Sequence, residues 1–105
     1  MTEQPSTLYA KLLGETAPIT WQELEPCFAR GALLVVGATQ DLIAMAQVVA
    51  ENDQGKVSAW LASGQLKKVD DGDAADLLAR DPPLWAVVVA PWVLVQERRG
   101  EPVVH

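Results

Sequence analysis

The sequence predicts an α+β fold, in which a small sheet of two to four strands is covered by several short helices. The main evidence is a β-branched stretch from Leu84 to Glu97 and a second apolar run of strand length at residues 32–36. Elsewhere, apolar residues recur at helical spacing and capping residues mark helix starts. This alternation is typical of helices packed on one sheet. If the run at 32–36 and the segment Leu84–Ala90 are neighbours, the helical crossover between them permits a parallel pairing.

The stretch from Leu84 to Glu97, LWAVVVAPWVLVQE, is the central strand of this prediction. In an extended chain its alternate residues point to opposite sides, and both sides are apolar. Such a strand belongs in a sheet covered on both faces, or in one whose second face meets another subunit. Pro91 cannot donate a ladder hydrogen bond, so we expect one strand bent there or two shorter strands meeting there. A tight two-residue hairpin is not expected, because Ala90, Pro91 and Trp92 lack the Asn-Gly or Gly-Gly pairs that such turns favour.

Local signals place the other elements. Thr20 and Glu23 form a capping box, and Pro26 should kink or restart the helix that follows it. Asp73 and Asp76 resemble an acidic version of the same box. In chain order we expect a frayed lead-in at 1–5, helices at 6–14 and 20–30, a strand at 32–36, helices at 40–52 and 55–64, an exposed strand at 66–69, a short helix between 73 and 81, the strand or strands from 84, and a polar tail at 99–105.

The composition is that of a single globular domain spanning residues 1–105, since 50% of the residues are hydrophobic and 21% are charged. No run reaches the roughly 18 apolar residues of a membrane span, and the first residues lack an export signal, so we expect a cytoplasmic protein without membrane contact. The net charge of −6 disfavours binding to nucleic acid, because the phosphate backbone is also negative. One cysteine, Cys27, excludes an internal disulfide and fits a reducing compartment.

Four stretches carry a resemblance to a known family: LYAKLLGET, ITWQELEPCFARG, VSAWLASGQLKKV and LWAVVVAPWVLVQE. From Leu8 to about Arg98 the chain resembles the bacterial proteins grouped as domain of unknown function 2288, and the last stretch is the most specific part. The resemblance implies a small bacterial, cytoplasmic protein. It supplies no activity, cofactor or catalytic residue.

Residues that commonly carry catalysis are few. His105 is the only histidine and is the last residue, and Cys27 lies inside an apolar helical segment that favours a buried, unreactive thiol. An acidic cluster lacks the glycine and distant glutamate of an EF-hand loop, which favours a capped turn over a cation site. The cluster consists of Asp70, Asp71, Asp73 and Asp76. We therefore expect no metal and no cofactor.

The favoured hypothesis is a non-enzymatic protein-interaction module that self-associates, as a homodimer, or binds an unidentified protein partner. It rests on the strand that is apolar on both sides in a chain too short to cover it generously. Trp85 and Trp92 face opposite sides of a straight strand unless a bend changes this, and an exposed tryptophan is a typical interface anchor. The candidate interface residues are Trp85, Pro91, Trp92 and Val93.

The alternative is a small-anion or small-molecule binding protein, or a weak enzyme, with a site at the strand-to-helix turn 37–41. Backbone amides at the start of a helix can bind a phosphate there. No Walker-type lysine or glycine-rich pattern accompanies the turn, and Asp41 would repel an anion. The candidate residues are Arg30, Gly37, Ala38 and Thr39.

Overall fold

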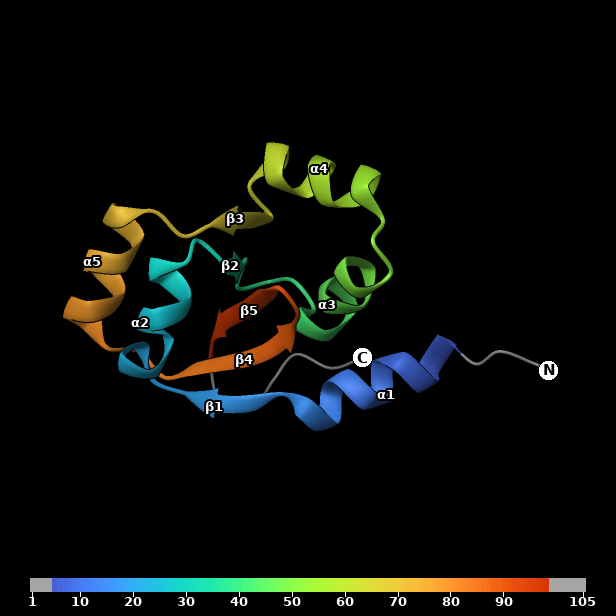
Figure 1. Cartoon of the computed structure of the whole chain (residues 1–105), viewed down its shortest axis with the longest axis horizontal. Helices are drawn as coiled ribbons and strands as arrows, with labels where there is room; N and C mark the ends of the chain where they lie inside the picture. Colours follow the sequence, from blue (N-terminus) through green and yellow to red (C-terminus); the bar gives the residue numbers. More distant parts are fainter. Residues whose placement is uncertain (1–4, 99–105) are drawn as a thin grey trace.

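The computed structural model describes residues 5–98, which form a five-stranded sheet with helices on both faces (Figure 1). The helices are α1 (Pro5–Glu15), α2 (Trp21–Ala29), α3 (Leu42–Ala50), α4 (Gln54–Ser63) and α5 (Asp71–Arg80). The strands are β1 (Ala17–Ile19), β2 (Leu33–Val36), β3 (Leu66–Lys68), β4 (Leu84–Val89) and β5 (Trp92–Glu97). The predicted α+β class is confirmed. The predicted number of strands is wrong, because β1 adds an edge strand that the sequence analysis did not include.

The expectations at the two ends of the chain fall largely outside these residues. The predicted polar tail at 99–105 lies outside the described residues, as does the lead-in at 1–5 except for Pro5, where α1 begins. The helix was expected to kink or restart at Pro26. It does not restart there, because α2 runs through this proline as one helix. The capping box of Thr20 and Glu23 at its start is confirmed, with both reciprocal hydrogen bonds present.

The order of strands across the sheet is β1-β4-β5-β2-β3. Strands β4 and β5 form an antiparallel hairpin, with Val89 opposite Trp92. Strand β2 runs parallel to β5, so the apolar run at 32–36 pairs with the second half of the C-terminal stretch and not with its first half. The edge strands β1 and β3 are antiparallel to their neighbours. The C-terminal hairpin therefore lies at the centre of the sheet, as Figure 1 shows.

The connection between β4 and β5 differs in part from the expectation. Of the two arrangements expected, the prediction of two shorter strands that meet near Pro91 is confirmed, and that of a single bent strand is wrong. The strands are joined by a two-residue turn, which was not expected. The peptide bond between Ala90 and Pro91 is cis. A cis proline at the third position is the defining feature of a type VI turn, which needs neither Asn-Gly nor Gly-Gly. Pro91 thus separates the two strands, as one of the two expected arrangements has it, but does so in a tight turn that was not expected.

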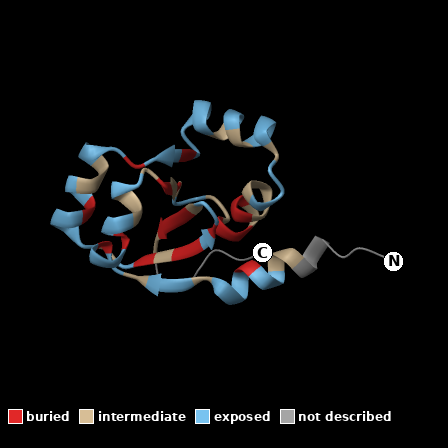
Figure 2. Ribbon diagram, in the orientation of Figure 1, coloured by how far each residue is buried: buried red, intermediate tan, exposed pale blue. Residues whose placement is uncertain are grey.

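Each face of the sheet buries its own apolar cluster, because neighbouring residues of a strand point to opposite faces. The face under α1, α3 and α4 includes Leu34, Val36, Leu66, Val87, Val89 and Leu94. The face under α2 and α5 includes Leu33, Val69, Leu84, Ala86, Val93 and Val95. Figure 2 shows this buried layer in the middle of the molecule. Helices thus cover both faces of the central strands, which was one of the two arrangements expected.

Helix α4 is the least buried of the helices in the part of the chain that the structure describes. None of its residues is buried, and it contacts mainly β3 and α3 (Figure 2). Asp53 caps its first turn by accepting a hydrogen bond from the amide of Lys56 at 3.1 Å. Asn52, with a φ of 60°, reverses the chain between α3 and α4. This reversal leaves a hollow between the two helices and the hairpin.

Candidate functional site

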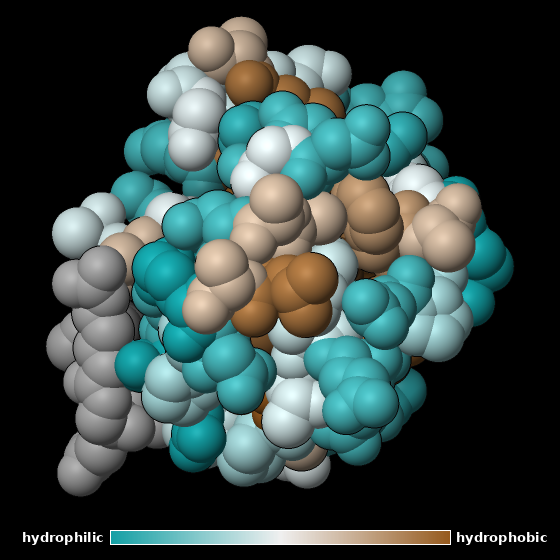
Figure 3. Space-filling view, turned by 90° about the vertical axis from the view of Figure 1, so that its left-hand side faces the viewer, coloured by the Kyte–Doolittle hydropathy of each residue, from teal (hydrophilic) through white to brown (hydrophobic). Residues whose placement is uncertain are grey.

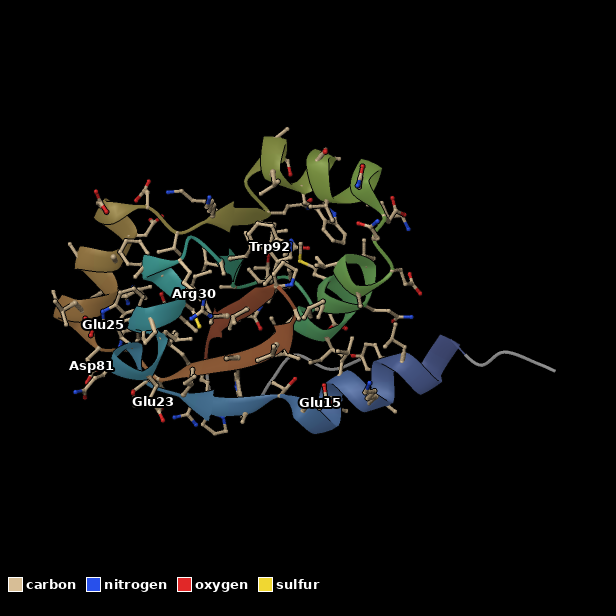
Figure 4. All side chains as sticks on the ribbon, viewed as in Figure 1. Glu15, Glu23, Glu25, Arg30, Asp81 and Trp92 are labelled. Carbon is tan, nitrogen blue, oxygen red and sulfur yellow. The ribbon has the colours of Figure 1, made fainter. Side chains whose placement is uncertain are left out.

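A groove of about 310 Å³ lies where α3, α4 and the start of β5 meet. Trp92 forms one wall, since the first side chain of β5 points to the α3 face of the sheet, and Figure 4 shows it directed toward α4. The polar residues around the groove are uncharged. We call this the tip groove, and its lining residues are Val49, Asn52, Gln54, Val57, Ser58 and Trp92.

The turn of the hairpin beside this groove is apolar and accessible. We call it the hairpin tip, and it consists of Val88, Ala90, Pro91 and Trp92. Val88 is 62% exposed, because α2 and α5 do not extend over this end of β4. Ala90 and Pro91 are exposed and Trp92 is half-buried. The tip contains no charged side chain. Its burial against another apolar surface therefore requires no charge to leave water.

The four predicted interface residues do not form one surface. Pro91 and Trp92 lie together in the hairpin tip, whereas Val93 is buried under α2 and α5. Trp85 lies near the other end of the hairpin, opposite Gln96. It is half-buried, and the guanidinium carbon of Arg98 lies 5.3 Å from its ring centroid. Because the hairpin reverses the chain, both tryptophans pack against the α3-side cluster, and only Trp92 adjoins the groove.

The turn at 37–41 is built around its own carboxylate. Asp41 caps α3, with one oxygen accepting hydrogen bonds from the amides of Ile43 at 2.9 Å and Ala44 at 3.1 Å. Its other oxygen accepts a hydrogen bond from the hydroxyl of Tyr9 in α1 at 2.9 Å. The amides that would face an anion are thus already hydrogen-bonded to Asp41, whose charge favours the helix start.

A buried glutamine fixes the same turn from the sheet. Gln96, in β5, is 3% exposed, and its Nε2 donates hydrogen bonds to the carbonyl oxygens of Gly37 at 2.8 Å and Gln40 at 2.7 Å. The remaining residues predicted for an anion site at this turn, Ala38 and Thr39, are exposed. Gln96 and Asp41 together attach the turn to β5, α3 and α1.

Arg30 lies away from this turn. It forms the C-cap of α2, before β2 begins, whereas Gly37 follows the end of β2. The side chain of Arg30 instead donates a hydrogen bond to the Cys27 sulfur at 3.6 Å, and Cys27 is half-buried in α2. The geometry thus does not bring Arg30 to the turn, and an anion site there remains a prediction of the sequence alone. His105 lies outside the described residues.

Residues of the acidic cluster cap α5 and form its ion pairs. Its capping box is formed by Asp70 and Asp73, whereas Asp73 and Asp76 were predicted to form it. The helix therefore begins about one turn earlier than expected. Lys67 lies 3.5 Å from Asp70 and 3.0 Å from Asp73. At the other end of α5, Arg80 pairs with Asp76 at 2.7 Å and with Glu97 at 2.8 Å, which links the helix to β5. These carboxylates therefore stabilise the helix and its attachment to the sheet.

Acid is expected to weaken this end of the molecule. Hydrogen bonds from Arg80 hold the pKa of Asp76 below its ordinary value of 3.8, and the amide of Asp73 likewise lowers the pKa of Asp70. A carboxyl group with a lower pKa in the folded state stabilises that state above the unfolded pKa, and the contribution is lost as the pH falls through the folded pKa. The thermal midpoint should therefore fall below about pH 4, by a few degrees at most because both groups are exposed.

Circular dichroism melts of the wild type and of Asp76→Asn, from neutral pH to about pH 3, test this dependence. The variant should be slightly less stable at neutral pH, and the difference should disappear in acid. Parallel loss of stability in the two proteins would show that the contacts of Asp76 with Arg80 do not contribute.

Comparison with known proteins now places the chain. Residues 7–97 match the family described as "Protein of unknown function (DUF2288)". The chain belongs to the DUF2288 family. The resemblance drawn from four stretches of sequence is thus confirmed. The NMR solution structure of PA1075 from Pseudomonas aeruginosa is similar to this DUF2288 chain over its whole length. The two share 61% sequence identity with a TM-score of 0.78, and the match covers 100% of this chain and 97% of that chain. Among curated proteins, none matches significantly.

Two further observations concern the described part of this DUF2288 chain. Between residues 5 and 98, no group of three or more histidine, cysteine, aspartate or glutamate side chains is placed to hold a metal ion. Over the same residues, no helix has the length and apolar content needed to cross a membrane.

Proposed function

We propose that this DUF2288 protein is a non-enzymatic interaction module that self-associates as a homodimer through the hairpin tip. The observation that carries the proposal is the exposure of Val88, which is 62% accessible on a tip without charged residues. A β-branched aliphatic side chain gains free energy when it leaves water, at about 25 cal/mol per Å² of apolar surface. Pro91 lies in the turn of the same tip, and Trp92 belongs to the tip on the opposite, α3-side face of the sheet.

The exposed, apolar hairpin tip adjoins the tip groove, which suits a two-fold interface. In such an interface the same patch on both copies is self-complementary, so that the tip of each copy enters the groove of the other. Trp92 is the anchor, because it belongs both to the tip and to the wall of the groove, and tryptophan is enriched among residues that dominate binding energy. The uncharged rim provided by Asn52, Gln54 and Ser58 leaves no ion pair to be broken on association.

Net charge sets the expected salt dependence. Each copy carries a formal charge of −6, so two copies repel each other, and salt screens that repulsion. An interface made by the apolar tip should therefore strengthen as ionic strength rises. An interface made by ion pairs would weaken under the same conditions.

Absolute molar mass by light scattering, over a concentration series at low and moderate salt, tests the proposal. The wild type should approach twice 11.3 kDa as concentration and salt increase. Val88→Asp should weaken self-association at least about tenfold, because it would bury a charge in the interface. Trp92→Ala should weaken it as well.

The matched control is Leu78→Asp, which adds the same charge at a side chain that is 61% exposed on α5. It should self-associate like the wild type. A wild-type mass that stays at 11.3 kDa under all conditions would refute the dimer. Survival of the dimer in both Val88→Asp and Trp92→Ala would place the interface elsewhere.

A further inference from the structure

A second groove, of about 320 Å³, lies between α2 and α5, on the side of the sheet opposite α3. Its lining residues are Trp21, Gln22, Glu25, Leu78 and Asp81. Figure 3 looks onto this end of the molecule, where apolar residues gather near the middle of the face and hydrophilic residues surround them. We propose that this groove docks a cationic amphipathic segment of a partner protein, independently of the hairpin tip.

The apolar part of the groove joins an exposed side chain, Leu78, to a buried one, Trp21. Leu77 and Leu78 follow each other in α5, so they point about 100° apart around the helix axis. Leu77 is buried in the core, whereas Leu78 is 61% exposed beside the groove. Trp21, which is 3% exposed, forms the adjoining wall, and its ring centroid lies 5.7 Å from that of Phe28. An apolar anchor from a partner would thus contact a surface that does not need to rearrange.

The charges beside this apolar surface determine the chemistry of the partner. Glu25 of α2 and Asp81 after α5 line the same groove, and Figure 4 shows them at the same end of the molecule. Among residues 5–98, neither carboxylate has a hydrogen bond or an ion pair, unlike Asp76 and Glu97, which both pair with Arg80. Two unpaired carboxylates beside an apolar surface complement arginine or lysine side chains that flank an apolar residue.

The position of Asp81 is well defined before any partner arrives. It occupies the C-cap of α5 with a φ of 46°, and its amide donates a hydrogen bond to the carbonyl oxygen of Leu77 at 2.8 Å. Pro82 and Pro83 follow and restrict the backbone further. Little conformational entropy would be lost when a cation pairs with this carboxylate. The formal charge of −6 adds long-range attraction for a basic segment and repels nucleic acid and anionic lipid surfaces.

A peptide titration tests the proposal. The probe is a fluorescein-labelled amphipathic peptide of repeated Arg-Leu-Leu-Arg units, and the comparison peptide has glutamate in place of each arginine. Fluorescence anisotropy should show binding of the arginine peptide that weakens with salt, and no binding of the glutamate peptide. In ¹H–¹⁵N spectra of the full chain, the arginine peptide should shift the indole signal of Trp21 and the amides of Glu25, Leu78 and Asp81.

Variants separate a specific groove from the general field of an acidic protein. Glu25→Gln with Asp81→Asn should weaken binding about tenfold, which corresponds to the loss of two exposed ion pairs. Asparagine tolerates the left-handed backbone at position 81, so the fold should be kept. Glu15→Gln with Glu51→Gln removes the same charge from exposed positions on α1 and after α3, and binding should stay within about twofold.

Leu78→Ser should also weaken binding, while Val88→Asp should leave it unchanged. Equal losses in the two charge-matched pairs of variants would refute the groove in favour of nonspecific attraction. Chemical shifts confined to the hairpin tip, or no binding of the arginine peptide at low salt, would refute it as well.

Discussion

Replacing Leu94 by alanine is expected to lower the free energy of unfolding by about 2–5 kcal/mol. Leu94 is fully buried in the central part of the α3-side cluster. Its strand, β5, lies between β4 and β2, and its direct neighbours in the sheet are Val87 and Leu34. Removal of the isopropyl group would leave a cavity between the sheet and α3 that strands paired on both sides cannot close. Urea unfolding at neutral pH measures the change.

The control for this prediction is Leu78→Ala, which removes the same atoms from a side chain that is 61% exposed. Its effect on the free energy of unfolding should be within about 0.5 kcal/mol. If the two variants lost equal stability, Leu94 would not occupy the centre of the core. Because the denaturant slope reports the surface exposed on unfolding, an unchanged slope would show that the variants unfold from the same compact state.

The features that could be predicted from sequence are those that depend on composition or on residues close together in the chain. The β-branched composition of 84–97 predicts a strand whatever its neighbours are, and its two apolar sides predict helices on both faces or a second subunit. The capping box at Thr20 depends only on residues within one turn, so it too appears directly in the sequence. These predictions did not require knowledge of which segments meet in space.

Strand β1 could not be predicted in the same way. Three residues are too few to show a period of two, and proline at position 18 argues against a strand. Its pairing with β4, which places Pro18 opposite Trp85, is a tertiary contact at the edge of the sheet. A proline is tolerated at such an edge because its missing amide is not needed by a further strand.

The turn at Ala90–Pro91 shows a different limit. Rules for two-residue hairpins based on glycine and asparagine do not cover a cis proline, so a valid rule argued against the two-residue turn that is present. The consequence extends to the candidate site. Once the chain reverses, Trp85 and Trp92 share one face of the sheet, and Val88 is left exposed beside the turn.

The candidate site was predictable only in part. Trp92 and Pro91 stood out as apolar residues beside a break in the strand, and they do lie at the hairpin tip. The tip groove could not be foreseen, because its other walls come from α3 and α4. Nothing in the sequence indicates that Gln96 is buried, since a polar side chain is usually exposed. It is buried because two carbonyl oxygens of the turn at 37–41 need a donor.

Gln96→Leu is expected to lower the free energy of unfolding by about 1–3 kcal/mol. Leucine fills a similar volume but donates no hydrogen bond, so the carbonyl oxygens of Gly37 and Gln40 lose the amide that lies 2.8 and 2.7 Å from them. Both residues are only partly accessible to water, which limits replacement of the lost bonds. Hydrogen exchange of the amides of Ile43 and Ala44 should become faster, because the turn positions the Asp41 cap on α3.

Gln96→Glu distinguishes the hydrogen bonds from the packing. Glutamate matches glutamine in shape, but at neutral pH its carboxylate would face two carbonyl oxygens without a proton to donate. The loss should therefore exceed that of Gln96→Leu at neutral pH and decrease as acid protonates the carboxyl group. Gln22→Glu on the exposed side of α2 adds the same charge and should change stability little. If Gln96→Glu behaved like Gln22→Glu, the buried amide would not be what holds the turn at 37–41 to the sheet.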